Sequence, residues 1–332
     1  MRSDGLFIKK SIFCLFDGQL PFVNTTEVHL GVDDEERAYL NKLVAANFDN
    51  IASKKAHIGP EDFLATILPT GEDDFEPFVN YISDEIHNLM QEGADIGVGS
   101  GIFLLFEADE QNFVAFFKLD FQTKFLNVVG EAGTISWKKS TMVLPAASQK
   151  GFAFFYINLN TNQMQISDSK FYVQDRKCNY LEEYILKLEV YSSEKELVKT
   201  IDEVMVETIK EHYPEEVPQK VLEYKKVLAE TVEETGKIDL QVIEEKVFSD
   251  NEVAANSCKE KKEERKLPEE AVYVSPKLEK KLTKKQRIVT DNGIELLVPI
   301  ELLEDKSMFE YRQGDDGKIT IVLKEIGSIM NK

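Results

Sequence analysis

The chain has 332 residues, a formal net charge of −20 and 42% hydrophobic residues. This length suits two or three domains, and this composition excludes an intrinsically disordered protein. Because no apolar run approaches the roughly 20 residues of a membrane span, we expect a cytoplasmic protein without membrane contact. The three cysteines lie far apart with no CxxC pair, so we expect reduced thiols at Cys14, Cys178 and Cys258.

Residues 1–177 are predicted to form an α+β domain in which helices cover an antiparallel sheet. β-rich runs within the first 16 residues begin this domain. Two helices follow, because apolar residues recur at intervals of three and four in residues 39–44 and again in residues 75–90. Acidic residues precede both helices, and we expect the second helix to end near Gly93.

Two β-hairpins are predicted in the remainder of this domain. The apolar runs at residues 101–107 and 113–119 form the first hairpin, and we expect its strands to be buried on both faces. The runs at residues 152–157 and 164–167 form the second hairpin, with a turn between them.

Residues 178–255 have the periodicity of helices and are predicted to form an acidic helical region. Between residues 190 and 257 there are 17 acidic and 8 basic residues, which gives a net charge of −9. We expect a solvent-facing bundle, with an oligomerisation surface on the first helix as the alternative. The apolar stripes of the two main helices are Leu197, Ile201, Val204, Met205 and Ile209, and Val217, Val221, Tyr224 and Leu228.

The last two segments differ in character. Residues 256–290 are highly charged and contain prolines, which predicts a mobile basic linker. Residues 291–332 are predicted to form a small β unit of three short strands, with a tight turn at residues 314–317. Near the end of the linker, six basic residues stand against the single acidic residue Glu279: Lys277, Lys280, Lys281, Lys284, Lys285 and Arg287.

We call residues 277–287 the basic segment. A local charge of +5 in so acidic a chain predicts a surface that meets a polyanion, since 6 basic residues oppose 1 acidic residue. Lysines suit phosphate groups as mobile point charges. No aromatic residue lies between Lys280 and Arg287, so stacking on bases is not expected. The alternatives are a solvated helical turn and docking on an acidic protein surface.

We expect no catalytic site, metal site or cofactor. The four histidines lack the HExxH and HxH spacings, and the sequence has neither a nucleophile elbow nor a phosphate-binding loop. Residues 97–101 are glycine-rich but precede a strand, which predicts a flexible lead-in and not a dinucleotide site. A cation site, and with it an enzyme, is a third possibility that would need Asp168, Asp175, Glu182 and Glu183.

Four stretches follow one another in an ordered pattern. They are the glycine-led strand 99–106, the aromatic strand 113–119, residues 166–172 with the helix after them, and residues 294–300 with 309–311 and 318–324. This pattern resembles the bacterial nucleoid-associated protein family of the NdpA/YejK kind. That family often ends the helix after its central sheet with a glycine, whereas residues 185–189 contain none. The resemblance implies association with the nucleoid and DNA binding without base specificity, and it transfers no catalytic residue.

These observations lead us to expect a non-enzymatic nucleoid-associated protein. It would bind double-stranded DNA without base specificity through the basic segment, in the cytoplasm at the nucleoid. A homo-oligomer and further protein partners are also expected. The alternative is a cytosolic protein-interaction module whose basic segment docks on an acidic protein surface.

Overall fold

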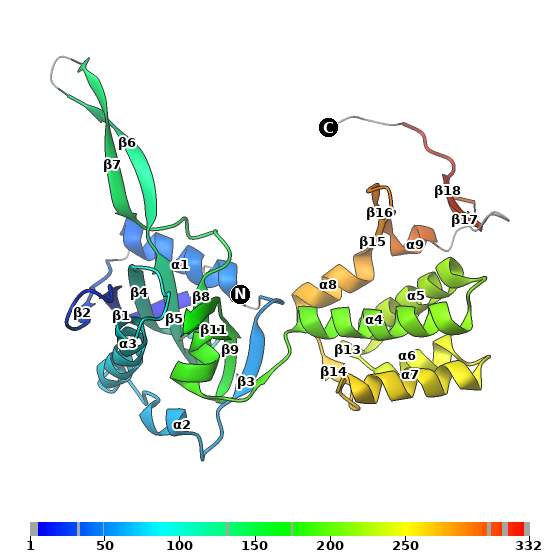
Figure 1. Ribbon diagram of the computed structural model, residues 1–332, viewed down its shortest axis with the longest axis horizontal. Coiled ribbons are helices and arrows are strands. Elements are labelled where there is room, and N and C mark those ends of the chain that lie inside the picture. Colours follow the sequence, from blue (N-terminus) through cyan, green and yellow to red (C-terminus); the bar gives the residue numbers. More distant parts are fainter. Residues whose placement is uncertain are drawn as a thin grey trace. The chain divides into compact units, whose positions relative to one another are not determined.

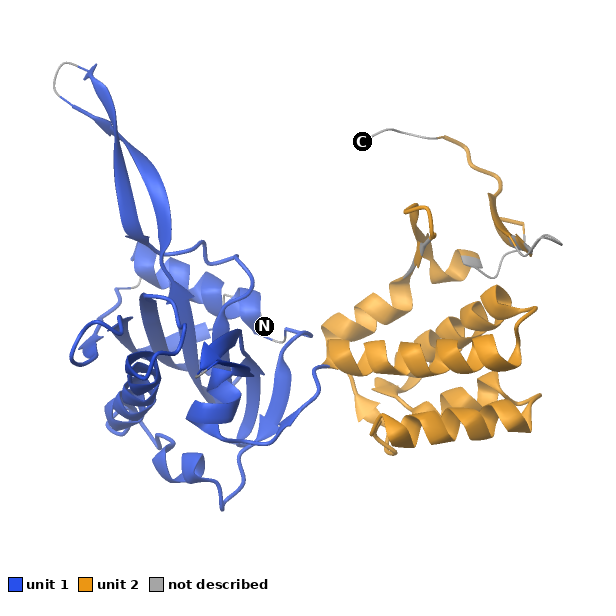
Figure 2. Cartoon of the chain, viewed as in Figure 1, with its two compact units in different colours: residues 1–193 blue, residues 194–332 orange. Residues whose placement is uncertain are grey.

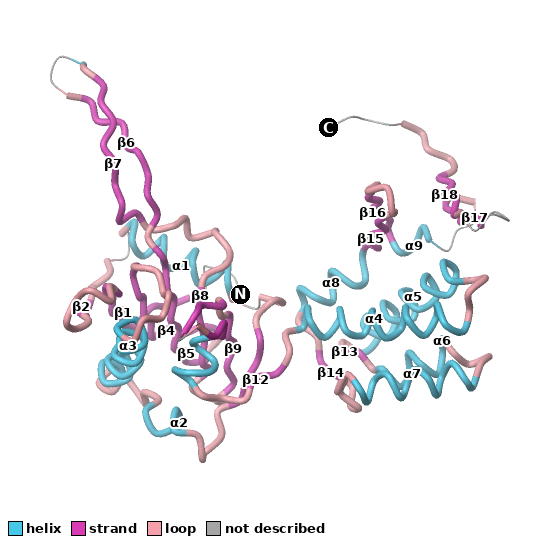
Figure 3. Tube along the Cα trace, in the orientation of Figure 1, coloured by secondary structure: helices cyan, strands magenta, loops and turns pink. Residues whose placement is uncertain are grey.

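The computed structural model describes residues 6–31, 34–48, 50–130, 133–173, 175–303, 307–313 and 318–328 (Figure 1). The chain divides into two compact units, unit 1 (Met1–Ser193) and unit 2 (Glu194–Lys332), shown in separate colours in Figure 2. Both units contain helices and strands (Figure 3). Within the described ranges, no helix is both long enough and apolar enough to cross a membrane.

Unit 1 is built on an eight-stranded antiparallel sheet (Figure 1). Its strands are β1 (Leu6–Phe16), β2 (Asn24–Glu27), β3 (Lys54–His57), β4 (Gly99–Ala108), β5 (Gln111–Asp120), β8 (Ala153–Asn158), β9 (Gln163–Ser167) and β12 (Val190–Tyr191). They lie in the order β12-β3-β9-β8-β5-β4-β1-β2, and each neighbouring pair is antiparallel. The predicted α+β class is therefore confirmed.

One face of the sheet is covered by α1 (Glu35–Asn47). Leu43 and Val44 of this helix are completely buried in a core that also contains Phe117 of β5. The acidic residues before this helix and in its first turn suit the positive end of its dipole. The strands of the first predicted hairpin, β4 and β5, are thus apolar on the side that meets α1.

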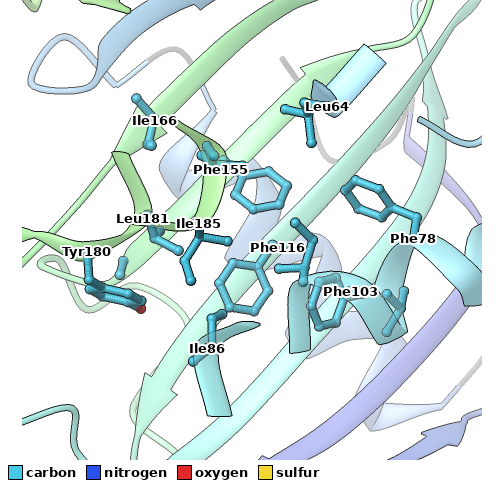
Figure 4. Packing of buried hydrophobic residues seen from close by; sticks show 14 of the residues in the cluster. Leu64, Phe78, Ile86, Phe103, Phe116, Phe155, Ile166, Tyr180, Leu181 and Ile185 are labelled. Carbon is cyan, nitrogen blue, oxygen red and sulfur yellow. The ribbon is translucent and has the colours of Figure 1, made fainter. Parts of the chain in front are cut away.

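The other face is covered by α3 (Phe75–Gln91), α2 (Phe63–Ile67) and the short π-helix η3 (Leu181–Leu186). Figure 4 shows this second core at close range. The sheet has a core on each face, so the prediction that β4 and β5 are buried on both sides is confirmed. The labelled side chains include Phe103, Phe116 and Phe155 from the sheet, Phe78 and Ile86 from α3, and Leu181 and Ile185 from η3.

The glycine-rich residues 97–101 have a different role from the one we expected. Gly99 and Gly101 lie inside β4 and are buried, so they are not a flexible lead-in. A Cβ atom on Gly99 would stand 2.2 Å from the Leu119 carbonyl oxygen, and one on Gly101 would stand 2.4 Å from the Cys14 sulfur. These glycines permit a close approach of neighbouring strands, which a side chain would prevent.

A two-stranded ribbon was not predicted from the sequence. Its strands β6 (Gln122–Val129) and β7 (Ile135–Val143) pair only with each other and extend away from the main sheet (Figure 1). The sequence signal was present, because Gly130 and Gly133 separate two runs that contain β-branched and aromatic residues. We call this element the ribbon.

Unit 1 extends further along the chain than the predicted boundary at residue 177. The hairpin of β10 (Lys170–Val173) and β11 (Arg176–Asn179) leads into η3. This helix ends at Lys187, whose φ of 52° lies in the left-handed region that favours glycine. Lys187 thus adopts this conformation although it is not a glycine.

Unit 2 is a helical bundle with one apolar core. Its four main helices are α4 (Glu194–His212), α5 (Val217–Thr235), α6 (Leu240–Val247) and α7 (Glu252–Glu264). Ile201 and Ile209 of the first predicted stripe, and Tyr224 of the second, are almost completely buried in this core. These side chains serve bundle packing, which was the expected role, and the alternative of an oligomerisation surface on this stripe is wrong.

The structure has helices where we expected a mobile linker. Residues 256–290 contain the end of α7, then β14 (Val272–Tyr273), α8 (Pro276–Lys284) and β15 (Lys285–Val289). Cys258 and Leu278 are buried, so this segment packs on the helical bundle within unit 2. β14 also pairs with β13 (Lys237–Ile238), which lies between α5 and α6.

The C-terminal strands form two further two-stranded sheets. β15 pairs with β16 (Glu295–Pro299), which is followed by α9 (Ile300–Leu303), and β17 (Phe309–Gln313) pairs with β18 (Ile319–Leu323). Val298 and Phe309 are buried, while Leu297 is exposed. The predicted turn at residues 314–317 lies outside the described residues.

Candidate nucleic-acid interface

Helix α8 begins at a well-formed cap. The Ser275 hydroxyl accepts a hydrogen bond from the Leu278 backbone N–H at 3.3 Å, and Pro276 occupies the first helical position. Both features are favoured at helix N-termini. The same hydroxyl donates to the buried Glu194 carboxylate at 2.6 Å, and the Ser275 N–H donates to it at 3.2 Å. The start of α8 is therefore fixed to the start of α4.

Two leucines hold α8 on the bundle. Leu278 is only 1% exposed, and Leu282, four residues later, packs against the core of unit 2. Residues four apart lie on one face of a helix, so this pair forms the buried face of α8. The helix packs beside α5. This anchoring determines which side chains of α8 face the solvent.

The solvent-facing side carries the predicted lysines. Lys277, Lys280, Lys281 and Lys284 follow the spacing i, i+3, i+4 and i+7, which places them on one side of the helix, and all four are exposed. We call these four residues the lysine face. Two of them lie in the last turn, where cations also suit the negative end of the helix dipole.

The two remaining predicted residues lie in β15. Lys285 begins this strand and is exposed. Arg287 pairs in register with Leu297 of β16, and its side chain lies outside the described part of the structure. The structure thus brings four of the six predicted residues together on one helical face.

A second group of basic residues, on α7, is neutralised by neighbouring acidic side chains. Lys261 contacts Glu211 of α4 at 2.5 Å, and Arg265 contacts Glu207 at 2.6 Å. Lys262 forms an ion pair with Glu244 of α6, whose side chain is buried. The acidic helices α4 and α6 therefore already have cationic partners from within unit 2.

The lysine face differs from this group in its electrostatic environment. Across the described residues, no carboxylate lies within ion-pair distance of Lys277, Lys280, Lys281 or Lys284. Their charges are exposed and have no ion-pair partner in the described ranges, whereas those of α7 are used inside the bundle. Among the described residues, the ion pairs with the acidic helices α4 and α6 are therefore made by α7 and not by the lysine face.

Two of the acidic residues considered for a cation form ion pairs instead. Glu182 forms an ion pair with Lys54 at 2.7 Å, and Glu183 forms one with Arg176 at 2.8 Å. Among the described residues, no group of three or more histidine, cysteine, aspartate or glutamate side chains is arranged to hold a metal ion. These carboxylates join the β10–β11 hairpin and η3 to the sheet.

Asp168 is the most perturbed acid of this set. Burial, with a smaller contribution from the nearby Glu182 charge, raises the pKa of its carboxyl group to about 7, against hydrogen bonds that lower it. Its carboxylate accepts those hydrogen bonds from the Ser169 N–H at 2.7 Å and the Glu182 N–H at 3.1 Å. The folded state therefore favours the protonated acid.

This raised pKa predicts a specific pH dependence of stability. Because the pKa in the folded state exceeds the ordinary value of 3.8, folding is favoured by protonation of Asp168. That contribution is complete below pH 3.8 and is lost as the pH rises through about 7. The associated slope is at most about 1.4 kcal/mol per pH unit.

We expect Asp168→Asn to remove this contribution. The free energy of unfolding of the wild type should fall relative to that of the variant between pH 5 and pH 8, as measured by urea denaturation. Asp175→Asn is the matched control, since Asp175 is an exposed acid near the same hairpin. Parallel pH profiles for the wild type and Asp168→Asn would contradict the assignment.

The profile of one protein family, described as nucleoid-associated protein YejK (NA37), matches residues 33–331. This match spans both units. Curated proteins give no match to the chain.

Proposed function

We propose, from the premise that this chain belongs to the family of nucleoid-associated protein YejK, that it binds duplex DNA through the lysine face of α8. Membership of the family gives the chain a nucleoid-associated role and a place at the bacterial nucleoid in the cytoplasm. The family is generally non-enzymatic. The direct contact with DNA, its lack of base specificity and the residues that make it are our proposal.

One observation supports the proposal: the lysine face is exposed and, in the part of the chain that the structure describes, forms no ion pair, although the chain has a net charge of −20. Phosphate groups are the anions that such a row of point charges attracts, and contacts to them contain no sequence information. The acidic remainder of the molecule repels DNA, so binding is confined to this surface. Lys285 and Arg287 continue the same segment into β15 and are expected to add contacts.

The test is a salt-dependent DNA-binding measurement on the full chain. If each of the four lysines contacts one phosphate, replacing all four with glutamine should reduce the log–log salt slope by about 3.6. By the same relation, raising the salt from 50 to 200 mM should weaken the part of the wild-type affinity that comes from these four contacts roughly 100-fold. Fluorescence anisotropy with a short labelled duplex measures both quantities, and duplexes of different sequence should behave alike.

A matched control separates local contact from net charge. Lys150, Lys170, Lys210 and Lys246 are exposed, belong to other elements than α8 and form no ion pair within the described residues. Their replacement with glutamine changes the net charge equally and should leave the slope nearly unchanged. Equal slopes for the wild type and the α8 variant would exclude the lysine face. Truncation at Pro268 is a poorer test, because it removes the buried Leu278.

The rival proposal is a protein-interaction module whose basic segment binds an acidic partner. The ion pairs of Lys261 and Arg265 with α4 support the view that basic and acidic helices associate in this chain. The same salt titration distinguishes the two, since a module of this kind should give no duplex binding at low salt.

A further inference from the structure

The ribbon has one strongly apolar face. Phe125 lies opposite Lys139, Asn127 lies opposite Trp137, and Val129 lies opposite Ile135. Residues that face each other across an antiparallel pair share one side, and every second residue returns to it, so these six positions form one face. We call it the apolar ribbon face. Its large apolar side chains are highly exposed: Phe125 67%, Val129 71%, Ile135 71% and Trp137 77%.

The opposite face of the ribbon is more polar. Lys124 lies opposite Ser140, Leu126 opposite Lys138, and Val128 opposite Ser136. Leu126 and Val128 are 47% and 39% exposed, which is less than any apolar residue of the first face. The ribbon is therefore amphipathic, although neither face rests on a core.

The structure gives the apolar ribbon face no cover within the described residues. Phe125 and Trp137 contact each other, with ring centroids 6.3 Å apart, and none of the residues of this face belongs to the three apolar cores. A lone two-stranded hairpin is only marginally stable in water. A partner that covers this face would stabilise both the ribbon and the complex.

We propose that the apolar ribbon face packs against the same face of a second copy of this chain. A patch of this kind is its own complement across a two-fold axis, because apolar side chains meet apolar side chains. The two ribbons would then stack face to face at about 10 Å, like the layers of a β-sandwich. This inference is independent of the proposed DNA contact on α8.

The exposed area is sufficient for such an interface. Phe125 and Trp137 each have about 150–250 Å² to bury. Together with the smaller Val129 and Ile135, the four exposed side chains offer roughly 500 Å² per copy. Two copies would bury roughly 1,000 Å² in total, which reaches the lower limit for a biological interface and fits a reversible dimer. The heat capacity of dissociation should be correspondingly positive.

The composition of the face favours a protein surface over DNA. Only Lys139 among its six positions is charged, and two positions are aromatic, as in the core of a protein–protein interface. A surface that contacts the DNA backbone needs several cations. The ribbon's other lysines, Lys124 and Lys138, lie on the opposite face and are free of the stacked interface.

Trp137 is the only tryptophan in the chain, so the wild-type protein reports directly on this face. As protein concentration rises through the association range, its emission should shift to shorter wavelength and iodide quenching should decrease. Sedimentation equilibrium on the same samples should show a dimer. An emission maximum and a monomer mass that are both independent of concentration would overturn the proposal.

A pair of variants tests which face is used. Phe125→Ser with Trp137→Ser should raise the dimer dissociation constant roughly 100-fold or more, because buried aromatic side chains are typical hot spots. Leu126→Ser with Val128→Ser, on the opposite face, is the control and should change it little. Far-UV circular dichroism confirms that each variant is folded. Equal dissociation constants for the two variants, or a Trp137 shift caused by duplex DNA in a protein that stays monomeric, would refute the proposal.

Discussion

Replacing Ile201 with aspartate should unfold unit 2 and leave unit 1 folded. Ile201 is 1% exposed in the core of the bundle, and burial of an unpaired carboxylate costs several kcal/mol, which approaches the whole stability of a small domain. Unit 1 has its own two cores and does not depend on this side chain. Circular dichroism should therefore show a loss of helical signal, and thermal denaturation should retain the transition of unit 1.

The same variant separates a core residue from an interface residue. Lys195→Asp is the control on the same helix, because Lys195 is exposed and its replacement introduces an acid without burial. If Ile201→Asp dissociated an oligomer while unit 2 kept its helical signal, the stripe on α4 would be a dimer face after all. We expect unfolding of unit 2 and, because α8 rests on this core, loss of DNA binding as well.

The sequence predicted best the elements whose apolar side chains are buried. β4 and β5 are nearly continuous apolar runs, and such runs need cover on both faces. The stripe around Ile201 and Ile209 has helical spacing and faces the bundle core. In both cases the burial that drives folding leaves a periodic pattern, so the pattern predicts the element.

The ribbon and α8 were not predicted, because in these two elements the sequence pattern does not reflect burial clearly. The ribbon is rich in apolar residues that unit 1 does not bury, so no pattern of burial marks it. α8 was hidden among charges and prolines, although Ser275 and Pro276 form a helix start and Leu278 and Leu282 have helical spacing. A short helix with one buried and one half-buried leucine carries a weak signal against a background of many lysines.

The candidate site was predicted in part for a similar reason. Charge density alone located Lys277 to Arg287 in the sequence. Which basic residues stay uncompensated depends on the packing of helices that are distant in the sequence. Lys261 meets Glu211 across 50 residues, and Arg265 meets Glu207 across 58 residues. No local pattern contains that information.

The last prediction concerns the anchor of α8. Leu278→Ala should weaken DNA binding although it removes no lysine. Leu278 is 1% exposed, and truncation of a buried leucine costs about 2–5 kcal/mol. We expect this loss to fall mainly on the docking of α8, so the lysine face would become mobile before the bundle unfolds. Amide hydrogen exchange across Pro276–Lys284 should accelerate.

The expected loss of affinity is on the order of tenfold, because mobile lysines must be ordered again when they bind phosphate groups. Leu278→Met is the matched control, since it nearly conserves volume and should retain both slow exchange and affinity. The salt slope should remain close to that of the wild type, because the number of cations is the same. If exchange accelerated in α8 while affinity stayed at the wild-type value, the lysines would act as a flexible tail, and the fixed helical face would have no part in binding.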